Sequence, residues 1–465
     1  MRQDEDFPRP GVGMATNLVQ PHRIVDARNS SFKSTLFDGA VEGHVLVKNI
    51  RNALPLNKPK MMSVFGYSAR NPDQNGPTGG ISPWMFGAGS FDYEEFGNGF
   101  FGNNADAGAT PVAFNGTIYS GGGSGATSQS MVVSPFDTIV QQAYDDGTAL
   151  FWNFVSGQPS VNPMSDACLV FGNAYATEGA DRPGIRDDYT DGLIKHVADR
   201  CNNTIVVFHN AGARLVDQFV DHPNVTAIIF AHLPGEASGR ALVSLLNGSS
   251  NPSGRLPYTV ARNESDYLVL GPDRAAEGSR FQNFPQSNFS EGVFVDYRHF
   301  DANNITPRYE FGFGLSYTTF EYGNLVIEKT ETTSNSTGTT TNTTSLERYP
   351  TGPIREGGQV DLWDVLVRVT AEIENTGDMD GAEVAQLYVG FPNGTEGVPV
   401  RQLRGFEKPF INASQTARVE FELTRRDLSV WDVVAQKWAL LAGERYDIFV
   451  GRSSRDLPLV GSVTI

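Results

Sequence analysis

Short apolar runs alternate with amphipathic stretches over residues 149–248 of this 465-residue chain. The apolar runs lack the two-residue period of a half-exposed strand, which is typical of strands buried on both faces of a parallel sheet. The stretches between them place Leu193, Ile194 and Val197 on one face of a helix, and helices of this kind cover such a sheet on both sides. The predicted strands are 61–68, 149–155, 168–176, 204–211 and 225–233, and the predicted helices are 134–146, 188–200, 213–220 and 236–247.

The first 50 residues have a weaker pattern. Residues 1–29, with three prolines, are interpreted as a linker, and residues 31–49 fit a helix only loosely. The segment 52–59, with two prolines, ends that helix before the first predicted strand.

The hydrophobic period changes to two in the last 100 residues. Val367, Val369 and Ala371 alternate with polar neighbours, and a second run around Phe421 does the same. Strands with one buried face, separated by turn signals, predict an antiparallel β-sandwich.

The changes of pattern predict two domains. The interpretation is an α/β sandwich domain with a mostly parallel sheet, an irregular linker, and an all-β sandwich that contains a Thr/Ser-rich insertion. A tract of that composition cannot bury a core. The predicted boundaries are 30–270 for the α/β domain, 271–317 for the linker, 318–465 for the β domain and 332–345 for the insertion.

Residues 69–130 are rich in glycine and aromatic side chains and are too long for an ordinary connection, which is typical of a functional segment. Its Gly121-x-Gly123-x-x-Ala126 spacing resembles a dinucleotide fingerprint, but no strand leads directly into it and no acidic residue follows at the required distance. We therefore predict no nucleotide cofactor.

Composition and charge narrow the class of protein. The formal net charge is −17, which argues against binding to nucleic acid or to an anionic membrane. No apolar window is long enough to cross a membrane, so we expect a soluble acidic protein. Cys168 and Cys201 either form one bridge or are two separate buried thiols, and their lack of a framework pattern favours the second interpretation.

Twelve of the 31 asparagines head an N-x-[ST] sequon, which is typical of the glycosylated surface of a secreted protein. The first residues nevertheless lack the apolar core and cleavage site of a signal peptide. We therefore expect a secreted parent protein whose front end is missing from this chain. The candidate glycosylation sites are Asn29, Asn115, Asn202, Asn224, Asn247, Asn263, Asn288, Asn304, Asn335, Asn342, Asn393 and Asn412.

Most familiar catalytic patterns are absent from the sequence. The seven histidines show no metal-ligand spacing, so we predict no metal, and neither a GxSxG elbow nor a P-loop is present. The remaining candidate is the segment 173–182 (NAYATEGADR) at the carboxyl end of a predicted buried strand, whose glycine-containing loop carries Glu178 and Asp181 beside Arg182. Carboxyl groups at the end of a parallel strand suit general acid–base chemistry, and the alternative is that they cap the next helix or pair with Arg182.

The chain, most clearly at this loop, resembles the C-terminal portion of fungal β-glucosidases of glycoside hydrolase family 3. The resemblance runs in order along nearly the whole chain, and its most specific segments are 251–259 (NPSGRLPYT) and 307–318 (PRYEFGFGLSYT). The other matching segments are 53–59, 176–194, 203–217, 222–242, 297–322, 381–392, 402–408 and 424–432.

The family resemblance implies that the predicted β-sandwich is of the immunoglobulin or fibronectin-III type. It also implies a retaining β-glucosidase that hydrolyses terminal non-reducing β-D-glucosyl residues in cellulose degradation. In that family an aspartate from a TIM-like barrel is the nucleophile and a glutamate from the α/β domain is the general acid/base. The position that carries over is Glu178, with Asp181 and Asp187 as alternatives. Trp84, Phe86 and Tyr175 are candidate substrate-binding residues, because sugar faces pack on aromatic rings.

The chain departs from the family in length. A barrel needs about 200–250 residues, and nothing before residue 30 supplies them. We therefore expect that the nucleophile is absent, that the barrel domain is the natural packing partner, and that these residues alone are inactive. The alternatives are a carbohydrate-binding or scaffolding module that uses the aromatics of 84–101, and a family 3 relative of other specificity such as a β-xylosidase.

Overall fold

The computed structural model describes residues 29–71, 112–113, 115–122, 133–176, 182–267, 289–330, 346–392 and 394–465. These residues form two compact units. The first contains the described residues up to Gly254 together with Arg262–Ser265, and the second contains Arg255–Ala261 and nearly all described residues from 266 onward. Each unit is described by itself.

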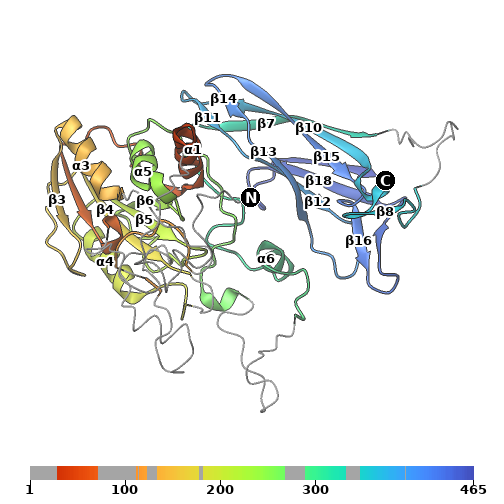
Figure 1. The fold of residues 1–465 in the computed structure, drawn as a ribbon, viewed down its shortest axis with the longest axis horizontal. Coiled ribbons are helices and arrows are strands. Elements are labelled where there is room, and N and C mark those ends of the chain that lie inside the picture. Colours follow the sequence, from red (N-terminus) through yellow and green to blue (C-terminus); the bar gives the residue numbers. More distant parts are fainter. Residues whose placement is uncertain are drawn as a thin grey trace, which may run out of the picture. The chain divides into compact units, whose positions relative to one another are not determined.

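The first unit is built on a six-stranded sheet in the order β1-β6-β5-β4-β2-β3 (Figure 1). Every neighbouring pair is parallel except β1–β6, so the sheet is mixed but mostly parallel. The central strands are buried along their whole length, as their continuous apolar runs require. The strands are β1 (Val45–Asn49), β2 (Met61–Phe65), β3 (Ala149–Asn153), β4 (Ala167–Ala174), β5 (Thr204–Asn210) and β6 (Val225–Phe230).

Helices follow the strands as the sequence predicted. Both α1 and α3 pack against α5, whereas α4 contacts β4 and β5. Ser134 and Asp137 form a capping box at the start of α3, and Gly147 ends this helix in the left-handed conformation. The helices are α1 (Lys33–Gly43), α3 (Pro135–Asp146), α4 (Asp188–Ala198) and α5 (Ser238–Leu246), with 3-10 turns η1 (Ser30–Phe32), η2 (Tyr67–Ala69), η5 (Gly235–Ala237) and η6 (Glu264–Asp266).

Two sequence predictions about these elements are wrong. The helix expected over 31–49 ends at Gly43, and the next residues form β1 because Val45 pairs with Phe230 of β6. The segment 213–220 forms hydrogen-bonded turns and no α-helix: the Val220 N–H donates to the Val216 carbonyl oxygen (2.8 Å), and the Leu215 N–H donates to the Ile185 carbonyl oxygen (3.0 Å). At β1, tertiary pairing overrides the local pattern.

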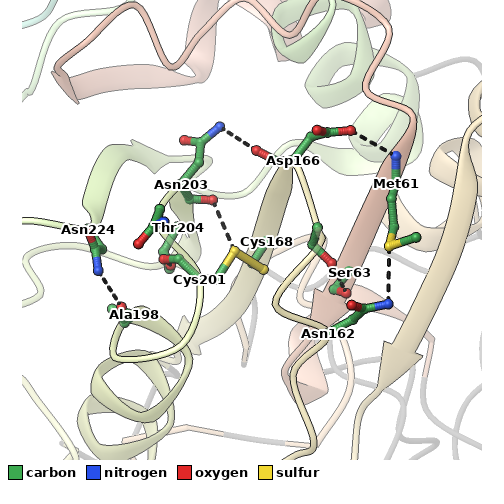
Figure 2. The surroundings of a disulfide bond; sticks show 12 residues. Met61, Ser63, Asn162, Asp166, Cys168, Ala198, Cys201, Asn203, Thr204 and Asn224 are labelled. Atoms are coloured by element: carbon green, nitrogen blue, oxygen red, sulfur yellow. Dashed lines mark hydrogen bonds between the residues drawn. A yellow bond between two sulfur atoms is a disulfide. The ribbon is translucent and has the colours of Figure 1, made fainter.

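The two cysteines form a disulfide, contrary to the interpretation as separate thiols (Figure 2). Cys168 lies near the start of β4 and Cys201 lies after α4, and both are buried. The bridge joins the strand to the connection that follows the helix packed on it. The neighbouring Asn203 side chain donates to the Asp166 backbone oxygen (3.1 Å), which ties the same two segments together again.

The second unit is an antiparallel β structure, as the two-residue period predicted. A three-stranded sheet in the order β15-β10-β7 and a four-stranded sheet in the order β13-β12-β18-β19 supply one core that contains Val369, Phe421, Leu387 and Ile448. The strands of the two sheets are β7 (Phe320–Lys329), β10 (Val365–Asn375), β12 (Ala385–Gly390), β13 (Gln402–Glu407), β15 (Thr416–Thr424), β18 (Arg445–Gly451) and β19 (Leu459–Thr464).

Shorter elements complete the second unit. Within the stretch expected to be an irregular linker, a short helix α6 (Tyr297–Ala302) begins after Asp296, whose side chain accepts from the Tyr297 N–H (2.6 Å). The small pairs are β8 (Ile354–Arg355) with β9 (Gly358–Gln359), β11 (Gly381–Ala382) with β14 (Phe410–Ile411), and β16 (Ser429–Asp432) with β17 (Lys437–Leu440), and a 3-10 turn η7 spans Val360–Trp363.

Candidate active site

The carboxyl ends of β2, β4, β5 and β6 meet at one edge of the sheet, where ligand sites of open α/β sheets form. Polar side chains gather there although the strands themselves are apolar. Asn173 and His209 lie at the ends of β4 and β5, and both are fully buried. This edge is the one that the sequence predicted for the catalytic loop.

Within the predicted segment 173–182, the loop at 177–181 lies outside the described residues, and so do its side chains Glu178 and Asp181. Trp84 and Phe86 also lie outside them. The residues on both sides of the loop are described. The Tyr175 N–H donates to the Val112 carbonyl oxygen (2.9 Å), and the Ala176 carbonyl oxygen accepts from the Gly122 N–H (3.0 Å), so the chain enters the loop from a fixed position.

Arg182 holds the other end of this loop. One terminal nitrogen of its guanidinium donates to the Tyr175 carbonyl oxygen (3.3 Å), and the other donates to the Ala213 carbonyl oxygen (2.8 Å). The same side chain therefore joins the chain after β4 to the chain after β5.

Tyr175 has no exposed surface in this structure. Its position one residue beyond β4 agrees with the edge of the sheet, but its burial argues against direct contact between its ring and a sugar. Its backbone contributes to this edge of the sheet, because the Tyr175 N–H donates to Val112 and the Tyr175 carbonyl oxygen accepts from Arg182.

Asp187, an alternative candidate for the acid, caps α4. Its side chain accepts from the Thr190 N–H (2.7 Å) and from Arg214 (3.4 Å). Arg214 is fully buried, pairs with Asp191 (2.7 Å) and lies over the Phe208 ring (4.9 Å). These contacts fix α4 to the segment after β5 and leave Asp187 with a structural role.

Beneath the edge lies a layer of buried polar side chains centred on His209. Its Nδ1 is 3.0 Å from the Ser68 hydroxyl oxygen and its Nε2 is 3.5 Å from that of Ser238. Burial lowers the pKa of His209 to about 3, so the ring is neutral and is not poised to take a proton from Ser68. His209 therefore has a structural role: it holds the end of β5 to Ser68 in η2 and to Ser238 at the start of α5.

The sequence analysis missed this layer, and it named Arg182 only as a neighbour of the loop carboxyls. For His209 a signal was available, because it is a polar residue near the end of an otherwise apolar strand. For Arg182 the sequence held no signal of its two carbonyl partners, one of which lies 31 residues further along the chain.

The described residues hold no group of three or more His, Cys, Asp or Glu side chains that is arranged to bind a metal ion. None of the helices in these ranges has the length and apolar character needed to cross a bilayer.

A mostly parallel α/β sheet followed by an antiparallel β-sandwich is the pair of folds that the sequence predicted. Residues 44–317 match the glycosyl hydrolase family 3 C-terminal domain, and residues 383–454 match the fibronectin type III-like domain. The chain belongs to glycoside hydrolase family 3.

Curated relatives match the chain from end to end. It is 51% identical over 466 residues to a "Probable beta-glucosidase M" of Aspergillus niger, covering 100% of this chain and 55% of that protein. It is 49% identical over 464 residues to "Beta-glucosidase cel3A" of Pyricularia oryzae, covering 100% of this chain and 56% of that protein. The chain thus spans about half the length of the curated relatives it matches.

The solved structures that resemble this chain include the β-D-glucoside glucohydrolase of Trichoderma reesei. The TM-score is 0.76 at 33% sequence identity, and the match covers 95% of this chain and 56% of that one. A β-glucosidase of Chaetomella raphigera gives the same TM-score at 32% identity.

Proposed function

We propose that this chain is the acid/base-bearing part of a retaining β-glucosidase. The observation that carries the proposal is the identity of about half of all residues, over the whole chain, to relatives named β-glucosidases. The proposed substrates are β-glucosides with a terminal non-reducing glucosyl residue, including the cello-oligosaccharides of cellulose breakdown. A family 3 specificity for another sugar, such as xylose, is the competing proposal.

In the proposed mechanism, Glu178 protonates the glycosidic oxygen as the nucleophile attacks the anomeric carbon. The resulting glycosyl-enzyme is then hydrolysed by water, from which Glu178 removes a proton. In retaining enzymes the two carboxyl groups lie about 5–5.5 Å apart, so the nucleophile must approach the loop at 177–181 closely. The aromatic side chains Trp84 and Phe86 are proposed to contact the sugar beside it.

We prefer Glu178 to Asp187 as the general acid because of the contacts that Asp187 makes. Both oxygens of Asp187 are engaged, one by the N-terminus of α4 and the other by Arg214. These contacts use the side chain to hold α4 against Arg214, whereas a general acid must lie within hydrogen-bond reach of the glycosidic oxygen.

The nucleophile is proposed to lie in the part of the enzyme that corresponds to the remaining length of the relatives, which this chain does not cover. A polypeptide of these 465 residues alone is therefore expected to give no turnover of p-nitrophenyl β-glucoside. Joining it to the unmatched part of the Aspergillus niger relative should restore turnover. Hydrolysis by the 465 residues alone that the substitution Glu178→Gln abolishes would contradict this part of the proposal.

The role of Glu178 is tested in the joined protein by changing the leaving group. Replacing a general acid costs about 10²–10⁴-fold where the leaving oxygen is basic. For Glu178→Gln we expect such a loss in kcat/KM on cellobiose and a much smaller one on 2,4-dinitrophenyl β-glucoside, whose leaving group needs no proton.

Asp187→Asn is the matched control, because it removes a carboxylate from the same edge. This variant should lower the stability of the protein and change kcat/KM on both substrates by the same factor. Equal losses on both substrates for Glu178→Gln would refute the assignment of Glu178 as the general acid, and Asp181→Asn would then be examined in the same assay.

The parent protein is proposed to be secreted and glycosylated. The Cys168–Cys201 disulfide and the dense sequons support this, since structural disulfides persist in oxidising compartments. Peptide mapping should find glycans on exposed sequon asparagines such as Asn202, Asn304 and Asn412. It should find none on Asn224, which is half-buried and donates its side-chain amide to the Ala198 carbonyl oxygen (2.9 Å).

A further inference from the structure

A small cavity lies in the first unit between the C-terminal halves of α3 and α5 and the amino end of β2. Most of its lining is apolar and includes Leu56, Pro59, Met62, Ile139, Val243 and Leu246. The volume of the cavity is about 40 Å³. One water molecule needs about 10–15 Å³ on the same measure, so the cavity has room for about three. It is therefore too small for a sugar ring and large enough for a small apolar group.

Polar side chains complete the lining and bond to one another. The Asn247 amide donates to the Gln142 side-chain oxygen (3.3 Å), and the Gln142 amide donates to an Asp146 carboxylate oxygen (2.8 Å). The Lys58 ammonium lies 3.7 Å from the other oxygen of Asp146. Gln142, Asp146 and Asn247 are half-buried, so this side of the cavity meets the solvent. An apolar wall with a few hydrogen-bonding groups suits a ligand that is apolar at one end and polar at the other.

Asn247 is also the first residue of the sequon Asn247-Gly248-Ser249. Its side-chain oxygen accepts from the Ser249 N–H (3.0 Å) and from the Ser249 hydroxyl (2.6 Å). Because the oxygen is held by the sequon itself, the amide nitrogen is the atom that faces Gln142 across the lining of the cavity. An N-linked sugar is attached to this nitrogen. The attachment point of a glycan therefore lies at the cavity.

The first sugar of an N-linked glycan fits this arrangement. It is N-acetylglucosamine, which is bonded to the asparagine through C1 and carries its acetamido group on the adjacent C2. The acetyl methyl group is apolar and small, whereas the acetamido N–H and the ring hydroxyls are polar. The glycosylated asparagine amide keeps one N–H, which can still donate to Gln142. The covalent bond also holds the sugar beside the cavity at a high effective concentration, so a small contact is sufficient to seat it.

Asn224 shows a half-buried sequon asparagine of the opposite kind, and it is not part of this cavity. Its amide donates to the backbone oxygen of Ala198 (2.9 Å), and the hydroxyl of its sequon residue Thr226 is buried and donates to the Asn203 side-chain oxygen (2.6 Å). At Asn247 the partner of the amide is a side chain that can turn aside, and the sequon serine is exposed. Only the second arrangement leaves room for a sugar.

We infer that Asn247 is glycosylated and that the N-acetyl group of its first sugar occupies the cavity between α3 and α5. The inference rests on the proposed secretion of the parent protein for the presence of a glycan, and on the cavity for the place of its first sugar. A sugar seated there contacts Ile139 of α3 and Leu246 of α5 at once. It therefore joins the two helices and stabilises the first unit.

Occupancy is tested by peptide mapping of the 465-residue polypeptide secreted from a filamentous fungus behind an added signal peptide. Release of glycans by peptide N-glycosidase F in water enriched in heavy oxygen converts each occupied asparagine into a labelled aspartate. We expect label at Asn247 and at the exposed Asn202, Asn304 and Asn412, and none at Asn224. Label at the exposed sites without label at Asn247 would overturn the inference and leave the proposed secretion intact. A complete lack of label would contradict both.

The place of the first sugar is tested by the rate at which the same enzyme releases glycans from the folded protein. A sugar that is seated for about nine-tenths of the time is available about tenfold less often, so release at Asn247 should be about tenfold slower than at the exposed Asn412. Ala143 lines the cavity, and Ala143→Leu should fill it and bring release at Asn247 close to the rate at Asn412. Equal rates at the two sites in the unsubstituted protein would overturn the seat, whether or not the variant folds.

Thermal unfolding gives an independent measure of the seated sugar. Ser249→Ala removes the sequon, and its effect on Tm is compared in the secreted protein and in unglycosylated protein from a bacterial periplasm. The loss of Tm should be about 2–4 °C larger in the secreted protein, as is typical of losing one packed apolar group in a domain of this size. Ser249→Thr, which keeps the sequon, is the matched control and should retain the Tm of the secreted protein. Equal losses for Ser249→Ala in the two forms would contradict the stabilising contact.

Discussion

The Arg182 guanidinium donates a hydrogen bond to the carbonyl oxygen of Tyr175, seven residues earlier in the chain. The bond spans the segment that carries Glu178, and a second bond from the same side chain, to the Ala213 carbonyl oxygen, fixes it to the neighbouring strand end. Arg182 is thus a positioning residue for the proposed acid/base. Its effect on catalysis should come through the placement of that loop.

Replacing Arg182 should impair the chemical step in the joined, active protein. Misplacing a reacting group by about 1 Å costs on the order of 10²-fold, so Arg182→Met should lower kcat by about 10- to 100-fold. Arg182→Lys should recover only part of this, since one ammonium cannot match the two-pronged geometry of a guanidinium. The measurement is kcat per folded enzyme, with folding followed by circular dichroism. An unchanged kcat in both variants, with only a lower Tm, would assign Arg182 a purely structural role.

Gly66, just after β2, is required by sterics. Its φ is +93°, and a Cβ atom there would lie 2.1 Å from the Phe171 carbonyl oxygen. Gly66→Ala should lower the free energy of unfolding by more than about 3 kcal/mol or prevent folding, because the overlap adds to the backbone strain.

Gly147→Ala separates the two contributions. Gly147 also has a positive φ (+71°), but nothing lies within 4 Å of its Cβ position, so this variant should lose only about 1 kcal/mol. Urea denaturation measures both. Similar losses at the two positions would show that close approach to Phe171 does not matter.

The disulfide should stabilise the first unit. Cys168 and Cys201 are 33 residues apart, and closing a loop of this length restricts the unfolded chain by about 3–4 kcal/mol. The double variant Cys168→Ala, Cys201→Ala should lower the urea midpoint by a corresponding amount, and a reducing agent should do the same to the unsubstituted protein but not to the variant. A midpoint that both changes leave unaltered would contradict this role.

Acid should destabilise the first unit through its buried histidines. Burial lowers the pKa of His44 to about 4 and that of His209 to about 3, so the fold holds both rings neutral. In the unfolded chain these rings take a proton near pH 6.5. The stabilisation is therefore complete above about pH 6.5 and is lost progressively as the pH falls toward the folded-state pKa values.

For His44 the loss between pH 7 and pH 4 is on the order of 3 kcal/mol. Urea unfolding measured at several pH values should show a decline in the free energy of unfolding from both rings. His209→Gln should make this decline less steep, because it removes the contribution of His209. His299→Gln, a change of the same type at a half-buried position in the second unit, should not. A slope that His209→Gln leaves unaltered would contradict the assignment.

Much of the fold was predictable because its elements carry strong local patterns. The run at β4 is apolar on both faces, and such a run has no stable place outside a covered sheet. The alternation in β10 likewise fixed which face of that strand is buried, with Val367 and Val369 inside and Arg368 exposed. Prediction failed at β1, where pairing with β6 outweighs the local preference, and at 213–220, where the chain forms turns and no α-helix.

The site was predictable only in outline. A carboxyl-bearing loop after a buried strand can be located from sequence, and the family resemblance adds a role for Glu178. The two carbonyl partners of Arg182 follow two different strands, and His209 in β5 lies beside Ser68 and Ser238 from two other elements. No local sequence pattern predicts contacts of this kind between distant segments.

The sequence by itself determined the class of fold, the family and the edge of the sheet at which chemistry is expected, because hydrophobic period and short motifs are local properties of the chain. Only the tertiary structure decided that Cys168 reaches Cys201, that Arg182 bonds the chain after β4 to the chain after β5, and that β3 is an edge strand among the described residues, with Phe151 and Trp152 exposed. These depend on which distant segments become neighbours, and that is set by the packing of the whole sheet with its covering helices.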